Sequence, residues 1–292
     1  ADDWVELYHT RGEDVSLADW YLSDDVDEPK KWALPAVSVP AGGHAVFNDI
    51  AGFGLSRDGE ELVLSYLPGT DQDRIADAVS FEAQDEGVSL GRYPDGGDYW
   101  FALTPSQGAP NANPSAHVAI DELMYHPIDP NEEYIELYNP LDQPMSLGDD
   151  AASWRLDGAV EYSFPAGTSI PAGGRLVIVG FDPAVETSRL VAFAVAYKAN
   201  LVGVSTRIVG PWTGNLSNAG ERVALERSVA GESPASPIAW VIVDEAIYGD
   251  TAPWPASPDG QGDALQRISA APGSSGNDPT NWCAACYSVP GK

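Results

Sequence analysis

Hydrophobic and polar residues alternate in short runs along this chain, and turn residues separate the runs. Val5 to Tyr8 shows the alternation, and Tyr134 to Tyr138 repeats it. A period of two residues places successive side chains on opposite faces of an extended strand. Further short apolar runs follow Gly-Gly turns, at residues 45–47 and 176–179. Short strands between frequent turns are typical of a β-sandwich, so the pattern predicts an all-β fold.

Two parts of the chain repeat one another in the same order. Residues 3–9 (DWVELYH) reappear as residues 133–139 (EYIELYN), and the Pro-Ala-Gly-Gly of residues 40–43 reappears at 171–174. Further matches in the same order pair Ser16-Leu17 with Ser146-Leu147, Trp20 with Trp154, Leu34-Pro35-Ala36 with Phe164-Pro165-Ala166, and Leu55-Ser56 with Leu216-Ser217. A repeated order of motifs indicates a duplication. We therefore predict two tandem β-sandwich domains, at residues 1–113 and 114–292.

The second copy contains an insertion. Matching positions are 131 residues apart at Pro40 and Pro171 but 161 apart at Leu55 and Leu216. The added residues lie at about 180–212, where Asp182-Pro183 is a suitable helix start and helix-forming residues follow. We predict one short helix in this insertion.

The first copy lacks an equivalent of the opening strand of the second. Residues 118–125 (VAIDELMY) form a convincing strand before the repeated motif, and no residues before Ala1 supply its counterpart. We therefore expect an unpaired sheet edge in the first domain, open to a neighbouring chain. A stretch rich in Gly, Pro, Asn and Ser, residues 105–116, links the two copies.

The composition is strongly acidic, with 44 Asp and Glu against 15 Lys and Arg and a formal net charge of −29. Such a surface repels phosphate groups, which argues against nucleic acid as a partner. The charge has two interpretations, a solvated acidic coat or carboxylates that capture divalent cations. No run of 18 or more apolar residues occurs, so we expect no membrane insertion.

The repeated motifs resemble the lamin-tail family, in particular its bacterial modules. Glu-Tyr-Ile-Glu-Leu-Tyr-Asn at 133–139, Ile-Pro-Ala-Gly-Gly at 170–174 and Gly-Pro-Trp-Thr-Gly-Asn-Leu-Ser at 210–217 carry the resemblance. It implies an immunoglobulin-like sandwich in each half, and a place in a secreted or cell-surface bacterial protein. The family has no shared catalytic residues, so the resemblance implies no enzyme.

Three sets of residues are candidates for a site. The loop with Asp129, Asn131, Glu132 and Glu133 offers oxygen ligands for calcium, although no EF-hand pattern is present and a solvated loop is the plainer interpretation. Cys283 and Cys286 form a short-loop disulfide in an oxidising compartment, with free thiols or a shared metal as the alternatives. Trp212 and Trp254 lack counterparts in the first copy, and either stack on a carbohydrate ligand or pack the insertion onto the sheet.

The residues around each apparent catalytic motif argue against a catalytic role. Gly87-Val88-Ser89-Leu90-Gly91 matches the G-x-S-x-G string of serine hydrolases, but Arg92-Tyr93-Pro94 follows it where the motif requires a helix. The four histidines, His9, His44, His117 and His126, lack the spacing of a helical zinc pair, and we interpret them as surface or turn residues.

Two functions from different classes follow. The first is a non-catalytic structural, adhesion or interaction module of a larger secreted or cell-surface protein, with a protein or polysaccharide partner and no cofactor. The second is an accessory ligand-binding module for carbohydrate or calcium. The oligomeric state cannot be read from the sequence.

Overall fold

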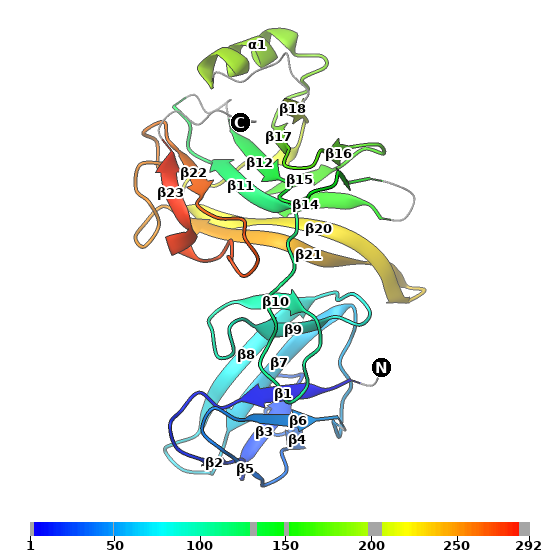
Figure 1. Cartoon of the computed structure of the whole chain (residues 1–292), viewed down its shortest axis with the longest axis vertical. Helices are drawn as coiled ribbons and strands as arrows, with labels where there is room; N and C mark the ends of the chain where they lie inside the picture. The colour runs from blue at the N-terminus through cyan, green and yellow to red at the C-terminus, as the bar shows by residue number, and fades with distance from the viewer. Residues whose placement is uncertain (1–2, 49, 129–132, 149–151, 198–205, 286–292) are drawn as a thin grey trace. The chain divides into compact units, whose positions relative to one another are not determined.

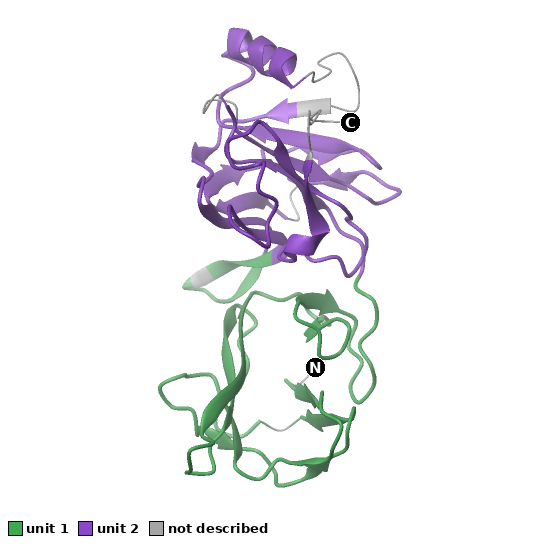
Figure 2. Ribbon diagram, turned by 90° about the vertical axis from the view of Figure 1, so that its left-hand side faces the viewer, with its two compact units in different colours: residues 1–114, 229–241 green, residues 115–228, 242–292 purple. Residues whose placement is uncertain are grey.

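The computed structural model of this chain describes residues 3–48, 50–128, 133–148, 152–197 and 206–285. The chain divides into two compact units, residues 1–114 with 229–241 (unit 1) and residues 115–228 with 242–292 (unit 2), which Figure 2 colours separately. Both units consist mainly of β-strands. The described part contains one α-helix, α1 (Thr187–Ala196), and one 3-10 turn, η1 (Pro279–Asn281). The expected all-β class is confirmed.

Unit 2 is built on two large sheets. The first has six strands in the order β18-β17-β12-β11-β22-β23, and the second has five in the order β19-β15-β14-β20-β21; β13 and β16 form a separate pair (Figure 1). The strands are β11 (Ala119–Met124), β12 (Tyr134–Tyr138), β13 (Met145–Ser146), β14 (Trp154–Gly158), β15 (Val160–Ser163), β16 (Ser169–Ile170), β17 (Arg175–Val179), β18 (Thr206–Val209), β19 (Thr213–Gly214), β20 (Gly220–Ser233), β21 (Ser236–Gly249), β22 (Ala264–Arg267) and β23 (Trp282–Ala285).

The core of unit 2 lies between these two sheets. Alternate residues of β12, Ile135 and Leu137, face the core, as do Val223 and Leu225 of β20, and all four are 0% exposed. The period-two pattern of the sequence produces this arrangement, because one face of each strand can be apolar throughout. Unit 2 is therefore a closed sandwich with a continuous apolar interior.

Helix α1 covers part of the outer face of the six-stranded sheet. Phe193 packs edge-on against Tyr134 of β12, with ring centroids 5.7 Å apart, in a cluster with Val177 and Val179 of β17. The predicted helix is confirmed, but it begins at Thr187 and not at Asp182-Pro183. The Asp182 carboxylate instead accepts the backbone N–H of Ala184, at 2.8 Å, in a turn that precedes the helix.

Unit 1 contains one four-stranded sheet, β4-β3-β7-β8, and three separate pairs, β1-β6, β9-β10 and β2-β5. Its strands are β1 (Val5–Tyr8), β2 (Val15–Ser16), β3 (Trp20–Ser23), β4 (Trp32–Ala33), β5 (Ser38–Val39), β6 (His44–Phe47), β7 (Gly59–Tyr66), β8 (Arg74–Glu82), β9 (Ser89–Arg92) and β10 (Trp100–Leu103). Residues 229–241, at the tip of the β20-β21 hairpin, also belong to unit 1, where Ala239 and Val241 cluster with Ala83.

Strand pairs in unit 1 follow the registers of unit 2. Val5 pairs with Phe47 as Ile135 pairs with Ile178. Arg92 pairs with Trp100 as Arg267 pairs with Trp282. One strand differs: β11 lies between β12 and β22 in unit 2, whereas no strand in the described part of unit 1 lies between β1 and β9.

Two glycines show how closely the hairpins correspond. Gly59 opens β7 with a φ of +107°, and Gly220 opens β20 with a φ of +106°. A Cβ atom would lie 2.4 Å from the carbonyl oxygen of Phe81 at the first position and 2.5 Å from that of Tyr248 at the second. Because only glycine combines this backbone conformation with the close approach, each hairpin requires it.

Candidate functional site

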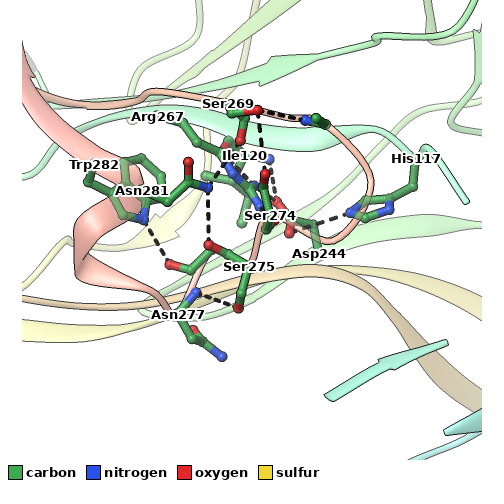
Figure 3. Close-up of polar contacts among 12 residues, drawn as sticks. His117, Ile120, Asp244, Arg267, Ser269, Ser274, Ser275, Asn277, Asn281 and Trp282 are labelled. Atoms are coloured by element: carbon green, nitrogen blue, oxygen red, sulfur yellow. Dashed lines mark hydrogen bonds and ion pairs between the residues drawn. The ribbon is translucent and has the colours of Figure 1, made fainter. Parts of the chain in front are cut away.

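A buried ion pair joins the two sheets of unit 2. Along β22 the side chains alternate, so Leu265 and Arg267 both face the interior. A guanidinium there needs an anionic partner, and Asp244 of β21 supplies it from the opposite sheet (Figure 3). The two side chains are only 1% and 6% exposed.

The pair also holds the backbone of β11. The register of β11 against β12 shifts between Ile120 and Glu122, which leaves Asp121 as a bulge. The Ile120 N–H donates to Asp244 Oδ2 at 2.7 Å, and Arg267 Nη1 donates to the Ile120 carbonyl at 3.2 Å. Carboxylate and guanidinium therefore satisfy both backbone groups of one residue in the central strand.

His117 approaches the same carboxylate from the segment before β11. Its Nε2 lies 3.6 Å from Asp244 Oδ1, and its Nδ1 lies 3.3 Å from the Ser115 carbonyl oxygen. Burial alone would lower the pKa of His117, but the Asp244 carboxylate outweighs that effect and the pKa lies above its ordinary value. Burial raises the pKa of Asp244, yet Arg267 and His117 together bring it below the ordinary value.

Arg267 further anchors the loop between β22 and β23. Its Nη2 donates to the Ser274 carbonyl at 2.7 Å, while Asn281 Nδ2 donates to the carbonyls of Ser269 and Ser275 at 3.0 and 3.2 Å (Figure 3). Trp282 Nε1 donates to the Gly276 carbonyl at 2.8 Å. The polar groups of this region thus bind the fold together.

A second group of charged residues lies on the outer face of the six-stranded sheet. Arg175 of β17 pairs with Asp121 at 3.0 Å and with Glu136 at 2.8 Å, and its guanidinium lies 4.3 Å from the centre of the Tyr138 ring. Both carboxylates are buried. Burial raises the pKa of Asp121, and the charge of Arg175 limits the rise.

Of the predicted calcium loop, Glu133 is described, whereas Asp129, Asn131 and Glu132 lie outside the described residues. Glu133 Oε2 accepts the Leu216 N–H at 3.2 Å, and burial raises the pKa of this carboxyl. Nearby in the chain, His126 Nδ1 lies 2.6 Å from Asp259 Oδ1. No group of three or more His, Cys, Asp or Glu suited to a metal is found among the described residues. The calcium site stays a prediction.

The predicted disulfide also stays a prediction, because Cys286 lies outside the described residues. Cys283 is half-buried in β23, its Sγ donates to the Gln266 carbonyl at 3.5 Å, and burial raises the pKa of the thiol.

The two candidate tryptophans occupy the core of unit 2 or its border. Trp212 is 6% exposed, and a Cβ on Gly180 would lie 3.1 Å from its Nε1. Trp254 is half-buried and its ring centre lies 6.2 Å from that of Trp282. These positions favour packing over ligand stacking, the two alternatives that the sequence left open.

The sequence did not point to Asp244, Arg267 or His117 as a group. The interpretation of the histidines as surface or turn residues did not foresee the contact of His117, whose side chain is 31% exposed, with a buried carboxylate. The signal that could have found the pair is the duplication. Asp77 and Arg92 occupy the matching positions of unit 1, where Arg92 Nη2 lies 2.8 Å from Asp77 Oδ1.

Comparison with known protein families gives one match. Residues 111–237 match the family model of the Lamin Tail Domain, an immunoglobulin-like family. The match covers β11, β12 and α1 and ends within β21, so it includes His117 but neither Asp244 nor Arg267. The searches of curated proteins and of solved structures found no match to this chain. In the described part, no helix is long and apolar enough to cross a bilayer.

Proposed function

We propose that this chain is a non-catalytic structural and interaction module, made of two tandem lamin-tail-type sandwiches, within a larger secreted or cell-surface protein. The family match of residues 111–237 supports the class of the second sandwich. The common strand registers of the two units support a duplication of that sandwich. The resemblance to bacterial lamin-tail modules, which usually occur in secreted or surface proteins, supports the secreted location in this proposal.

One observation carries the absence of catalysis. One group of residues suited to acid–base chemistry, His117, Asp244 and Arg267, makes its polar contacts with one another and with the backbone of Ile120, Ser115 and Ser274. A catalytic aspartate and histidine orient toward a nucleophile or a substrate atom. Here they orient toward the two sheets that they join.

Deletion of this region from the longer gene product tests the proposal. We expect neighbouring domains to keep their turnover rates per molecule, while attachment of the protein to its partner or to the cell surface is lost. In parallel, the purified chain is incubated with chromogenic ester, phosphodiester and glycoside substrates. Turnover that His117→Gln abolishes, in a variant with an unchanged near-UV circular dichroism spectrum, would overturn the proposal.

A further inference from the structure

A hollow lies on the outer face of the five-stranded sheet of unit 2, beside the β14–β15 hairpin. Its volume is about 370 Å³, which is in the range of small-ligand sites. Its lining includes Arg155 and Asp157 of β14, Glu161 and Ser163 of β15, and Thr213 of β19. The β14 and β15 side chains point away from the core, because they alternate with Leu156 and Tyr162, which belong to it. We call this hollow the carboxylate groove.

The arginine of the carboxylate groove is already paired. Arg155 Nε donates to Glu226 Oε2 at 2.7 Å, and the Glu226 side chain is only 3% exposed. The other oxygen of Glu226 lies 3.4 Å from Nη2 of Arg222, whose Nε donates to Glu245. Because these carboxylates hold both guanidinium groups, the arginines offer little to an added anion.

Two carboxylates of the groove are left without close partners. Asp157 lies 3.5 Å from Arg155 Nη2 and 3.6 Å from Arg222 Nη1, which is longer than a charge-assisted hydrogen bond. The Glu161 carboxylate forms no hydrogen bond or ion pair in the described part of the chain. Together with the two carboxylates that hold the arginines, they set four negative charges against two positive ones. The groove therefore carries a local excess of negative charge.

The duplication provides a comparison for this groove. The β3–β4 hairpin of unit 1 corresponds to β14–β15, because Leu22 pairs with Trp32 as Leu156 pairs with Tyr162. All four of these side chains contribute to the core of their own unit. The outward residues of the two hairpins do not contribute to these cores, so the fold does not dictate their charges.

The outward charges of the two hairpins differ at one matching position. Lys31 precedes Trp32 in the first hairpin as Glu161 precedes Tyr162 in the second. Lys31 Nζ forms an ion pair with Asp24, the residue that follows β3. Unit 1 thus supplies its own ammonium group to the carboxylates of this hairpin, whereas unit 2 has a further carboxylate at the same position.

From these observations we propose that the carboxylate groove binds the ammonium group of a lysine side chain from a basic segment of a partner protein. An ammonium group has three donors, which suit the carboxylates of Asp157 and Glu161 and one hydroxyl, that of Ser163 or Thr213. The net charge of −29 attracts a basic segment and repels an acidic one. This inference rests on the interaction role proposed above and names its surface and its chemistry.

Titration by nuclear magnetic resonance tests the inference on the isotope-labelled full chain. The ligand is the peptide acetyl-Gly-Lys-Gly-amide, and its Nε-acetylated form is the control of similar shape without the charge. With the lysine peptide we expect saturable shifts in the backbone amides of residues 155–163 and 213, at a dissociation constant of about 1–10 mM. With the acetylated peptide we expect none, because a neutral amide leaves the two carboxylates without a counter-charge.

Three variants of the chain complete the design. Glu161→Gln keeps the shape of the side chain but removes its charge, and should weaken binding of the lysine peptide about three- to tenfold. Glu221→Gln makes the same change at an exposed position outside the groove and should leave the dissociation constant nearly unchanged. Glu161→Lys copies unit 1 and should abolish binding, because the chain then supplies the ammonium group itself. Melting curves check that each variant folds; if Glu161→Lys does not, Glu161→Gln still decides.

Four results would overturn the proposal. Three concern the site: no saturable shifts up to about 50 mM lysine peptide, equal binding after Glu161→Gln, or shifts spread over acidic surfaces away from residues 155–163 and 213. The fourth concerns the source of the ligand, since tighter binding of butane-1,4-diamine than of the lysine peptide would assign the groove to a free amine. None of these touches the proposal of a non-catalytic module. That proposal fails by turnover in the substrate assays, which in turn says nothing of lysine binding.

Discussion

Arg267 and Asp244 form a buried ion pair between the two sheets of unit 2, and Arg92 and Asp77 form the matching pair of unit 1 in partial contact with solvent. The residue types, the registers and the tryptophan beside each arginine are the same. The surroundings differ, because β11 brings Ile120 against the pair in unit 2, and no strand in the described part of unit 1 does the same for Asp77 and Arg92. The two ion pairs have the same residue types but different burial, so the same substitution in each measures the effect of burial on stability.

Asp244→Ala should therefore destabilise unit 2 by about 3–5 kcal/mol, because it leaves a buried guanidinium and the Ile120 N–H without their acceptor. Asp77→Ala should cost unit 1 less than about 1 kcal/mol, as exposed ion pairs do. Denaturant-dependent hydrogen exchange, resolved by peptide, measures the free energy of unfolding for each unit separately. Equal losses in the two units would contradict the assigned difference in burial.

The stability contributed by His117 should depend on pH. Its pKa is higher in the folded than in the unfolded state, because Asp244 favours the imidazolium. The contribution is therefore complete below the unfolded pKa, about 6.5, and disappears as the pH rises through the folded pKa.

We expect the melting temperature of the wild type to exceed that of His117→Gln by more in acid than at alkaline pH. Differential scanning calorimetry at several pH values measures the two proteins side by side. His9→Gln, at a half-buried histidine of unit 1, is the matched control for the substitution itself. If the difference in melting temperature between wild type and His117→Gln stayed constant across the pH range, the ion pair with Asp244 would not be its cause.

Core truncations should differ between the units in the same direction as burial. Leu137→Ala should cost about 2–5 kcal/mol, because it leaves a cavity at a position with no exposure. Leu7→Ala removes the same atoms from a half-buried position, and we expect a clearly smaller loss. Urea unfolding followed by peptide-resolved exchange compares the two.

Removal of divalent cations should leave the melting temperature unchanged if the loop at residues 129–133 is a solvated acidic loop. One oxygen of Glu133 already accepts the Leu216 N–H, which engages part of the proposed ligand set. Melting curves with EDTA, calcium and magnesium test this expectation. A calcium-specific rise in melting temperature that Glu133→Gln abolishes would assign the predicted site.

Much of the fold could be predicted from the sequence, because strands with one buried face must alternate and tight turns require particular residues. The period-two runs marked β1 and β12, the apolar run after a Gly-Gly turn marked β17, and the repeated Pro-Ala-Gly-Gly marked matching turns. The length of the insertion located helix α1, although the turn at Asp182 moved its start by four residues beyond Pro183. These features depend on local preference and on side-chain period.

The partners of the charged residues were decided by tertiary structure alone. Asp244 and Arg267 lie on strands of different sheets, so their contact depends on how the sheets face each other. The assignment of residues 229–241 to unit 1 likewise depends on contacts between segments far apart in the chain.

The separate strand pairs of unit 1 needed both levels of information. Sequence comparison located the strand that has no counterpart and predicted an unpaired edge. Only the sheet order shows that β1 and β9 belong to two separate strand pairs, and only the side-chain positions bring Asp77 and Arg92 together. A linear pattern fixes which residues can be buried, because burial on one face follows the period of the strand. It leaves open what they are buried against, because that depends on the packing of strands that are distant in the chain.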